Sequence, residues 1–417
     1  MISVQDALHQ ILAESKQLPP AKIRLTNCTG LVLAEDTIVG CDSPPFDKAM
    51  MDGFAVMSSA DAIQHGHAES AARCSNSKLP LRIVETITAG TVPSCVVDAT
   101  TAARIMTGAP LPAGADCVIP VERAVVEQDQ PDQVCVSVKD LIAEKHVLRR
   151  GALAVEGDPL LGRGVTLQAQ HIAALAEFGM AHVPCVPQPK VAVLATGDEL
   201  LDVSEPLVRG KIRNSNEPML LSQIQRAGSV GYGLGIAADN VDSLVEKIGQ
   251  GLSCDALLLS GGVSAGTLDL VPQVLTQLGV CEIFHKVAMK PGKPLWFGQL
   301  STGDHKCLIF GLPGNPVSSM VCFEVFVRPA LQKLAGFQSE ESVKQTATLQ
   351  TDVQLKGDRI TYFPATFQQS ERGLQATALP WAGSADLRTT AFAEGLVILD
   401  PVQGPFVAGT SVSCLLW

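Results

Sequence analysis

The sequence lacks the features that mark a secreted or membrane-spanning chain. No basic segment followed by a long apolar run opens it, and no stretch approaches the roughly 18 uninterrupted apolar residues of a transmembrane helix. It also lacks CxxC spacing, because its twelve cysteines lie singly between Cys28 and Cys414. We therefore expect a cytoplasmic protein whose cysteines are small apolar core residues rather than metal ligands or redox pairs.

An excess of positive charge is missing as well, since 31 Lys and Arg face 42 Asp and Glu and the formal net charge is -11. A general binder of nucleic acids or of anionic membranes needs a basic face, so we expect neither partner. Any anionic ligand must then meet a local basic pocket. With 417 residues, 46% hydrophobic content and no internal repeat, the chain predicts a globular protein of two to four domains.

The first part of the chain predicts one helix followed by mostly β structure. Residues 3–15 carry apolar side chains at helical spacing, with Ser3 and Asp6 placed as a capping pair, which indicates an amphipathic docking helix. From about 21 to 185, short β-branched runs alternate with Gly and Pro turns, and a helical pattern over 168–178 interrupts them.

Residues 190–335 alternate in the βαβ pattern that is typical of a doubly wound α/β domain. We expect strands at 190–195, 231–236, 255–260, 282–288, 295–300 and 307–311, and helices at 216–227, 240–252, 268–278 and 316–334. The short strands after Gly336 predict a small terminal β-barrel or sandwich. Those strands are expected at 345–355, 359–367, 396–399 and 411–416.

The run Leu257–Leu270 is the most informative segment. An apolar strand pattern ends there at Gly261 and Gly262, and an amphipathic segment follows. Glycines let a backbone approach a ligand closely. A helix starting near Leu268 would aim its free N–H groups at an anion, which is the layout of a phosphate cradle. A tight turn between strand and helix would explain the same glycines, so the pattern alone leaves both readings open.

Polar residues follow other predicted strands, at the sheet edge where ligands of open α/β sheets lie. The first strand runs into Thr196–Glu199, and the last into Leu312–Ser318. Asp239 follows the second strand and could equally cap the next helix. Nearby, Lys286, Lys290 and Lys293 crowd a proline-stiffened turn. Like charges this close favour an anion among them, although a solvated basic loop would have the same sequence.

Two motifs in the first half of the chain also carry polar side chains. Asp47 and Asp52 lie in the loop Pro45–Val56, where a carboxylate could simply cap or turn the backbone. Thr107 lies in the turn Arg104–Pro110. Each motif is weak by itself.

Taken together and in order, these motifs resemble the MoeA family, the molybdopterin molybdenumtransferases. The resemblance rests on PPFDKAMMDGFAV, RIMTGAPLP, VLATGDEL, GKIRNSN, LLLSGGVSAGTLD, VAMKPGKPLWFG and GLPGNPVSS. It implies a homodimer with a MogA-like α/β domain and a C-terminal β domain. The implied boundaries are a docking helix at 1–19, an elongated module at 20–40 and 158–185, an inserted β domain at 41–157, the α/β domain at 186–336 and the β domain at 337–417.

The resemblance also implies the chemistry, which is the insertion of molybdate into adenylylated molybdopterin with Mg²⁺-dependent hydrolysis of the adenylate. The implied catalytic residues are Asp52, Asp239, Asp269, Glu199, Lys286 and Lys290, of which Asp52, Asp239 and Asp269 would hold the metal. The implied substrate-binding residues are Thr107, Gly261, Gly262, Ser264, Lys293, Pro294, Pro313, Asn315, Pro316, Ser318 and Ser384. The expected partners are small-molecule substrates, a MogA-type adenylyltransferase and proteins of molybdoenzyme maturation.

This chain departs from the family pattern at charged positions. In the family's RRRGED-type run, Leu148 replaces the first arginine and Ala152 and Leu153 replace the two acids, and Pro364 replaces the arginine of its DFQRG-type run. Arg359 or Arg388 could substitute for that last cation. The alternatives to an active transferase are a divergent paralogue that acts on a related substrate and a non-catalytic scaffold of the same fold. Adenylyl transfer of the MogA type is disfavoured by the N-terminal motifs.

Overall fold

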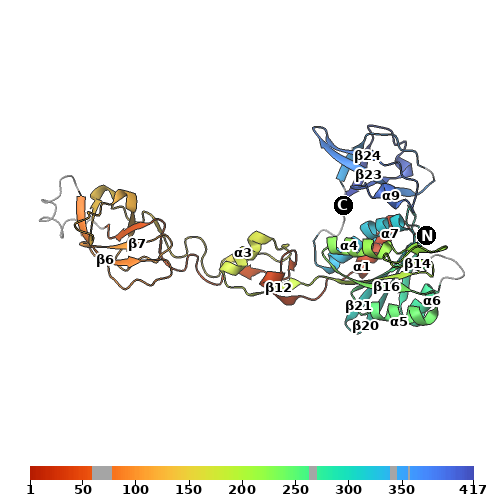
Figure 1. Ribbon diagram of the computed structural model, residues 1–417, viewed down its shortest axis with the longest axis horizontal. Coiled ribbons are helices and arrows are strands. Elements are labelled where there is room, and N and C mark those ends of the chain that lie inside the picture. The colour runs from red at the N-terminus through yellow and green to blue at the C-terminus, as the bar shows by residue number, and fades with distance from the viewer. Residues whose placement is uncertain (59–77, 263–269, 339–344, 356) are drawn as a thin grey trace. The chain divides into compact units, whose positions relative to one another are not determined.

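The computed structural model describes residues 1–58, 78–262, 270–338, 345–355 and 357–417. These residues form two compact units, and Figure 1 labels many of their helices and strands. The first comprises Met1–Glu35, Arg163–Ile172 and Ala181–Trp417, and the second comprises Asp36–Gly162 and Ala173–Met180. Within the described part of the chain, no helix has the length and apolar character needed to cross a membrane.

The first unit begins with helix α1 (Val4–Glu14). Ser3 is its N-cap and accepts a hydrogen bond from the backbone N–H of Asp6 at 3.0 Å, so the predicted capping pair is confirmed. After α1, a three-stranded antiparallel sheet follows in the order β1-β12-β2. Its strands are β1 (Ala21–Arg24), β12 (His182–Val186) and β2 (Val32–Leu33), and helix α3 (Ala169–Glu177) precedes β12.

The centre of the first unit is a six-stranded sheet in the order β16-β13-β17-β21-β20-β18, in which the first four strands are parallel. The strands are β16 (Val230–Ala237), β13 (Lys190–Thr196), β17 (Ala256–Ser260), β21 (His305–Leu312), β20 (Trp296–Thr302) and β18 (Cys281–His285). Apolar residues of α5 (Val241–Gly251) and α6 (Val271–Gln277) form one core against this sheet. A second core gathers α1 and α4 (Asn216–Arg226) with a helical stretch from Pro316 to Leu334. The expected doubly wound α/β domain is therefore confirmed.

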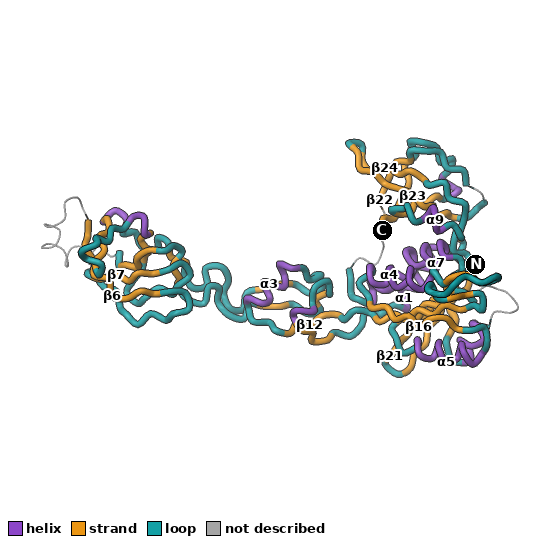
Figure 2. Tube along the Cα trace, in the orientation of Figure 1, coloured by secondary structure: helices purple, strands orange, loops and turns teal. Residues whose placement is uncertain are grey.

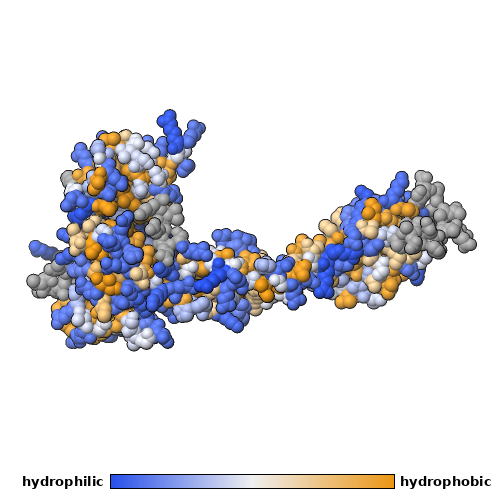
Figure 3. Space-filling model, turned by 180° about the vertical axis from the view of Figure 1, so that it is seen from behind, coloured by the Kyte–Doolittle hydropathy of each residue, from blue (hydrophilic) through white to orange (hydrophobic). Residues whose placement is uncertain are grey.

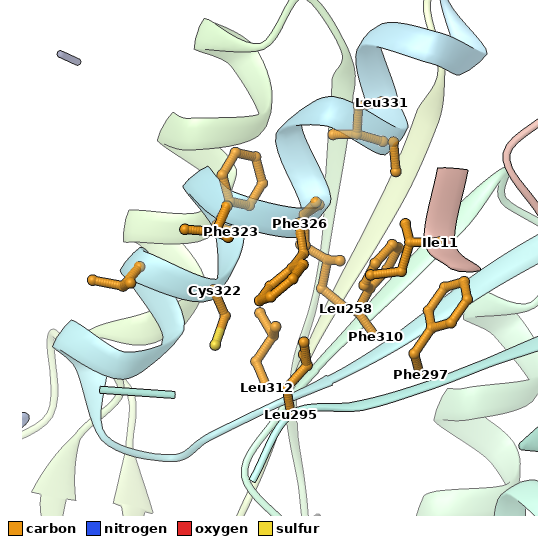
Figure 4. Close-up of a cluster of buried hydrophobic side chains, with 14 of the residues drawn as sticks. Ile11, Leu258, Leu295, Phe297, Phe310, Leu312, Cys322, Phe323, Phe326 and Leu331 are labelled. Atoms are coloured by element: carbon orange, nitrogen blue, oxygen red, sulfur yellow. The ribbon is translucent and has the colours of Figure 1, made fainter. Parts of the chain in front are cut away.

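The second of these cores fixes α1 to the sheet. Ile11 of α1 is fully buried and lies beside Phe297 and Phe310 of the central strands (Figure 4). The helical stretch that covers them comprises α7 (Pro316–Cys322), a π-helical segment (Phe323–Val327) and α8 (Arg328–Leu334). Full burial of a side chain of this size contributes about 1.5–3 kcal/mol, so the packing of Ile11 anchors the helix.

Helix α6 differs from the prediction. It begins at Val271 rather than near Leu268, and Pro272 in its first turn has no N–H to donate. Its seven residues make it too short for the extended phosphate-cradle helix that the amphipathic pattern indicated. The anion site proposed for this domain therefore does not depend on the N-terminal end of α6.

The last part of the chain is a closed five-stranded barrel, since β23 pairs with both β24 and β25. Its strands are β22 (Gln345–Leu349), β23 (Ile360–Ser370), β24 (Gly373–Ala378), β25 (Gly395–Leu399) and β26 (Ser411–Leu416), and a short helix α9 (Leu387–Thr390) lies between β24 and β25. Strand β24 is absent from the sequence prediction, because its run contains a single buried residue, Ala376. The short strand β19 (Met289–Lys290) of the α/β domain adds to β23.

The second unit is built on a five-stranded sheet in the order β8-β5-β7-β6-β9, antiparallel except for β6 and β7. Its strands are β5 (Gly53–Val56), β6 (Lys78–Ile87), β7 (Thr101–Ile105), β8 (Cys117–Pro120) and β9 (Gln133–Ser137). Two small ladders complete it, β3 (Thr37–Ile38) with β11 (Pro159–Leu161) and β4 (Lys48–Ala49) with β10 (Val147–Leu148). Figure 2 shows its strands and connecting loops, in agreement with the mostly-β prediction.

The described surface mixes polar and apolar residues, which are interspersed over the face that Figure 3 shows. The described part of the chain contains eleven cysteines. Six of them are buried, as predicted for small core residues, whereas Cys41 and Cys281 are exposed.

Candidate functional site

A pocket of about 640 Å³ lies at the carboxyl edge of the parallel strands in the first unit. The exits of β13, β17 and β21 and the start of α4 form most of its wall, and Ala385 and Leu387 from the barrel segment close it. The residues predicted from sequence that line it are Glu199, Gly261, Pro294, Pro313, Asn315 and Pro316. Since ligands of open α/β sheets bind at this edge, the pocket is the candidate substrate site.

The two glycines after β17 have no room for a side chain. Gly261 has φ +97°, and a Cβ there would lie 2.7 Å from the carbonyl oxygen of Thr196. Gly262 has φ +65°, and its Cβ would lie 2.6 Å from a methyl group of Val271. Close packing against β13 therefore requires both glycines, whatever else they contact. The predicted residues Ser264 and Asp269 lie outside the described residues.

Two polar atoms at the pocket lack hydrogen-bond partners among the described residues. Asn216 donates from Nδ2 to Ser260 Oγ at 2.6 Å and to the Gly314 carbonyl at 2.8 Å, but its Oδ1 is buried without a partner. Thr196 Oγ1 is likewise buried and unpaired in the described part of the chain. Both residues line the pocket, and buried polar atoms are normally satisfied, so these two point to a ligand or an ordered water. Asn216 was not predicted, although the polar run GKIRNSN ahead of a helix contained the signal.

The carboxylates of Asp198 and Asp239 join the C-terminal ends of β13 and β16 through hydrogen bonds. The backbone N–H of Asp239 donates to Asp198 Oδ1 at 3.1 Å, and the backbone N–H of Asp198 donates to Asp239 Oδ2 at 3.3 Å. The proposed capping role for Asp239 is wrong, because the N-cap of α5 is Asn240, which accepts from Ser243. Asp198 is absent from the predicted site residues, although it follows Gly197 at a predicted strand end.

Ser384 of the barrel segment contacts Asn315, which lines the pocket. Asn315 Nδ2 donates to Ser384 Oγ at 3.0 Å, and the Val317 N–H donates to the Ser384 carbonyl at 3.1 Å. Ser318 is buried on α7, and the carbonyl of Pro313 accepts a hydrogen bond from the Ser319 hydroxyl. The structure thus brings together Asn315 and Ser384, two residues implied by the family resemblance that lie 69 positions apart in the chain.

The three predicted lysines lie on one turn, Lys286–Lys293, which we call the lysine turn. Lys286 has φ +73°, a left-handed conformation that costs a residue other than glycine about 1–3 kcal/mol. Two backbone bonds close the turn, from Lys286 N–H to Leu295 O at 2.8 Å and from Val287 N–H to Lys293 O at 2.9 Å. Strain of this kind persists where surrounding contacts hold it, and it clusters at functional sites.

The barrel brings a further cation to the lysine turn. Arg359 donates from Nη1 to the carbonyl of Met289, in the turn, at 3.0 Å, and β19 pairs with β23 at Ile360 and Thr361. Pro364 is buried in β23 opposite Leu396. Arg359, one of the two arginines that could replace the cation missing at position 364, is therefore bonded to the lysine turn.

In the second unit, Asp52 and Thr107 are in direct contact. Asp52 Oδ1 accepts hydrogen bonds from the Thr107 backbone N–H and from its hydroxyl, both at 2.7 Å. The backbone bond first and the hydroxyl bond second hold the pKa of the Asp52 carboxyl below its usual range. Pairing of β5 with β7 creates this contact, since it places the turn after β7 beside the residue that precedes β5.

Asp47 has a structural role in the second unit. Its Oδ1 accepts from the Arg150 backbone N–H at 2.8 Å, and its Oδ2 forms an ion pair with Arg149. Arg149 also pairs with Glu144, and these acidic partners raise the pKa of its guanidinium. Two departures from the family pattern lie nearby: Leu148 pairs with Lys48 in the β4 and β10 ladder, and Leu153 is 68% exposed.

The described residues do not form a ready-made metal site, because no group of three or more His, Cys, Asp or Glu side chains gathers among them. Of the predicted metal ligands, Asp52 belongs to the second unit and Asp239 to the first. Within the first unit, the adjacent carboxylates of Asp198 and Asp239 are a hard oxygen donor set of the kind that Mg²⁺ takes.

Family models match almost the whole chain. The MoeA N-terminal region (domain I and II) matches residues 2–179, the probable molybdopterin binding domain matches 192–333, and the MoeA C-terminal region (domain IV) matches 346–417. These three stretches contain all the motifs on which the resemblance was based.

Curated relatives and solved structures agree with these matches. Proteins named molybdopterin molybdenumtransferase from Staphylococcus aureus (strain MRSA252) and Staphylococcus epidermidis (strain ATCC 12228 / FDA PCI 1200) are each 31% identical, across 100% of this chain and 95% of theirs. A crystal structure of a molybdopterin biosynthesis MoeA protein from Pyrococcus horikosii is 27% identical, covers 100% of this chain and 99% of its own, and has a TM-score of 0.79. The chain belongs to the MoeA family, the family of the molybdopterin molybdenumtransferases.

Proposed function

We propose that this chain inserts molybdate into adenylylated molybdopterin in molybdenum cofactor biosynthesis, with Mg²⁺-dependent hydrolysis of the adenylate. Family membership supports the transferase activity and the pathway. The main support for this chemistry is the pocket at the carboxyl edge of the sheet, where Gly261 and Gly262 leave no room for a side chain and two buried polar atoms lack partners among the described residues. A substrate with a nucleotide and a pterin joined by phosphates needs such a groove beside backbone N–H groups.

The adenylate is proposed to bind over the exit of β17. Gly261 and Gly262 leave the backbone bare there, which lets a phosphate approach without contacting a Cβ. Asn216 Oδ1 accepts hydrogen bonds, and Thr196 Oγ1 can donate or accept, so both suit the amino and ring nitrogen groups of a base or a pterin. Pro313, Asn315 and Pro316 would form the opposite wall.

The two carboxylates at the exits of β13 and β16 are proposed to hold the metal. Asp198 and Asp239 each use one oxygen to accept a backbone N–H, which orients the side chains and leaves their other oxygens for a ligand. When bound, Mg²⁺ supplies positive charge to the phosphate oxygens during hydrolysis. Glu199, which lines the pocket, is proposed to orient the attacking water or molybdate oxygen. Asp269 stays a ligand predicted from sequence.

Molybdate is proposed to bind at the lysine turn. A tetrahedral oxyanion needs cations and several N–H or hydroxyl donors. Lys286, Lys290 and Lys293 supply the cations, and Arg359 adds a guanidinium that is already bonded to the turn. Ser318 and Ser384 are proposed as the hydroxyl donors. The same positive charge would stabilise the charge that develops on the adenylate phosphorus as its anhydride bond breaks and AMP leaves.

Asp52 and Thr107 are proposed to act on the substrate of a partner protomer in a homodimer. Their mutual hydrogen bonds fix one carboxylate oxygen and leave the other free to accept from a substrate group. We also infer a cytoplasmic enzyme that receives adenylylated molybdopterin from a MogA-type adenylyltransferase and passes the finished cofactor to proteins of molybdoenzyme maturation.

The proposal is tested by AMP release from adenylylated molybdopterin in the presence of molybdate and Mg²⁺. We expect Asp239→Asn to lower the rate about 100-fold or more, because a metal ligand and its charge are lost. Asp242→Asn is the matched control, since Asp242 lies on the exposed first turn of α5 three residues away, and it should keep the wild-type rate. Equal rates for the two variants would remove Asp239 from the proposed mechanism.

A further inference from the structure

Ile2 forms a backbone bridge with the lysine turn, 284 positions further along the chain. Its N–H donates to the carbonyl of Lys286 at 3.1 Å, and its carbonyl accepts from the N–H of Ala288 at 2.8 Å. The bridge is parallel and is centred on Val287. The residue that leads into α1 thus pairs with the part of the turn that joins Lys286 to Lys290.

This bridge supports the strained residue of the turn. Lys286 has φ +73°, and its two backbone polar groups are both used: its N–H bonds to Leu295 O at 2.8 Å and its carbonyl accepts from Ile2. A lysine does not favour this conformation, so neighbouring bonds must hold it. Ile2 supplies one of those two bonds, and it also fixes Ala288 on the way to Lys290.

The bridge starts from an anchored helix, so it holds the turn against a rigid part of the fold. Ala7 and Ile11 of α1 are fully buried in the core, and Ile11 lies beside the sheet phenylalanines (Figure 4). Ser3, the next residue after Ile2, caps the helix through its bond to the Asp6 N–H. Glu14, at the other end of α1, pairs with Lys306 of β21. Ile2 therefore has little freedom to move away from the turn.

We propose that Ile2 is a positioning residue for anion binding: its backbone bridge sets the path of the lysine turn and hence the placement of the Lys286 and Lys290 ammonium groups. This inference rests on the proposed function in one respect, that the lysine turn takes molybdate. Charge-assisted bonds depend on geometry, so a loosened turn binds an oxyanion more weakly even though all its cations remain. The same lysines are proposed to stabilise charge at the adenylate, so a loosened turn also slows AMP release.

Ile2→Pro tests the inference, because proline removes the N–H that bonds to Lys286 while leaving every lysine in place. Binding of molybdate to the full chain is measured by calorimetry, and the kinetics of AMP release are measured over a range of molybdate concentrations. We expect the Kd and the KM for molybdate to rise roughly tenfold, with a smaller fall in kcat, because the displaced lysines are also proposed to stabilise charge at the adenylate. Ile2→Val keeps both backbone bonds and should match the wild type.

A second control separates positioning from general loosening of α1. Glu14→Gln removes the ion pair at the far end of the helix without touching the turn, so it should lower the melting temperature while leaving the Kd for molybdate unchanged. If Ile2→Pro does not fold, Ile2→Gly replaces it, since a more flexible residue at this position should still weaken molybdate binding several-fold.

The outcomes separate this inference from the proposed function. An unchanged Kd in Ile2→Pro, or equal weakening in Glu14→Gln, overturns the positioning role while the transferase activity stands. A wild-type protein that binds no molybdate also overturns it. If the wild type binds molybdate but releases no AMP, and Ile2→Pro binds more weakly, the positioning role holds and the proposed function fails.

Discussion

Asp52 and Thr107, 55 positions apart, are joined by two hydrogen bonds of 2.7 Å to the same carboxylate oxygen. Both residues were predicted as functional from separate motifs, and the antiparallel pairing of β5 with β7 brings them together. The bonds to the ionised form lower the pKa of Asp52, so this carboxylate stays charged at lower pH than an unpaired one.

Thr107→Val should therefore raise the pKa of Asp52 towards its ordinary value, because the hydroxyl bond is lost while the backbone bond stays. A carboxylate with a lowered pKa stabilises the fold above the usual range of Asp, and this contribution is lost as the pH falls through the lowered pKa. The variant should lose it at a higher pH. Titration of Asp52 by NMR is the measurement. Thr107→Ser keeps a hydroxyl and should titrate as the wild type does, and an unshifted pKa in Thr107→Val would contradict the assignment.

Gly261→Ala should destabilise the first unit. The added Cβ would lie 2.7 Å from the Thr196 carbonyl oxygen at φ +97°, so both space and backbone conformation oppose it. We expect a loss of about 1–3 kcal/mol in the free energy of unfolding, measured by denaturant titration. Gly249→Ala is the control, because Gly249 is a solvent-exposed residue within α5 and an added Cβ there would have no atom within 4 Å. This variant should gain about 0.5–1 kcal/mol in the free energy of unfolding. Equal stabilities would refute the close packing at the strand exits.

Arg359→Gln should weaken molybdate binding about 10- to 100-fold, the effect of losing one hydrogen bond to a charged group. Arg359 is the barrel cation bonded to the lysine turn, whereas Pro364 has no charge to offer. Calorimetry with molybdate checks it. Arg372→Gln, on the exposed turn between β23 and β24, removes the same charge from the same barrel and should leave the affinity unchanged. An unaffected Kd in Arg359→Gln would show that the missing arginine is not replaced at this position.

Glu324→Ala should cost about 3–5 kcal/mol of folding stability, the range for breaking a buried ion pair. Glu324 is 3% exposed in the π-helical segment and pairs with Arg226 and Arg328. Burial already lowers the pKa of Arg328, and removal of its partner would leave that guanidinium buried and uncompensated. Denaturant unfolding measures the loss. Lys306→Ala breaks a more exposed ion pair with Glu14 and should cost about 1 kcal/mol or less of folding stability. A similar loss in the Glu324 and Lys306 variants would contradict the prediction.

Much of the fold follows from sequence because its signals are local. The capping pair at Ser3, the βαβ alternation and the apolar central strands all appear within short windows of the chain. Strand β24 was not predicted because its residues are mostly small and half-exposed, and its pairing partners lie elsewhere. The start of α6 was misplaced because an amphipathic pattern does not mark the exact residue at which a helix begins.

The site could be predicted in part, for a similar reason. Motifs identified Asp239 and Glu199. The local sequence does not show, however, that Asp239 and Asp198 each accept a hydrogen bond from the other's backbone N–H, nor that Asp239 does not cap α5. Thr196 Oγ1 and Asn216 Oδ1 become buried without partners among the described residues only when the strands pack, so no sequence pattern shows them. The bridge between Ile2 and Val287 joins opposite ends of the chain, so no pattern of spacing could reveal it.

The most direct test of the account is AMP release by the wild-type chain from purified adenylylated molybdopterin, followed over a molybdate titration with and without Mg²⁺. The account predicts AMP release that requires both Mg²⁺ and molybdate, with one molybdenum cofactor formed for each AMP. If no AMP is released at any molybdate concentration, the result contradicts this mechanism, whether or not the protein binds nucleotide.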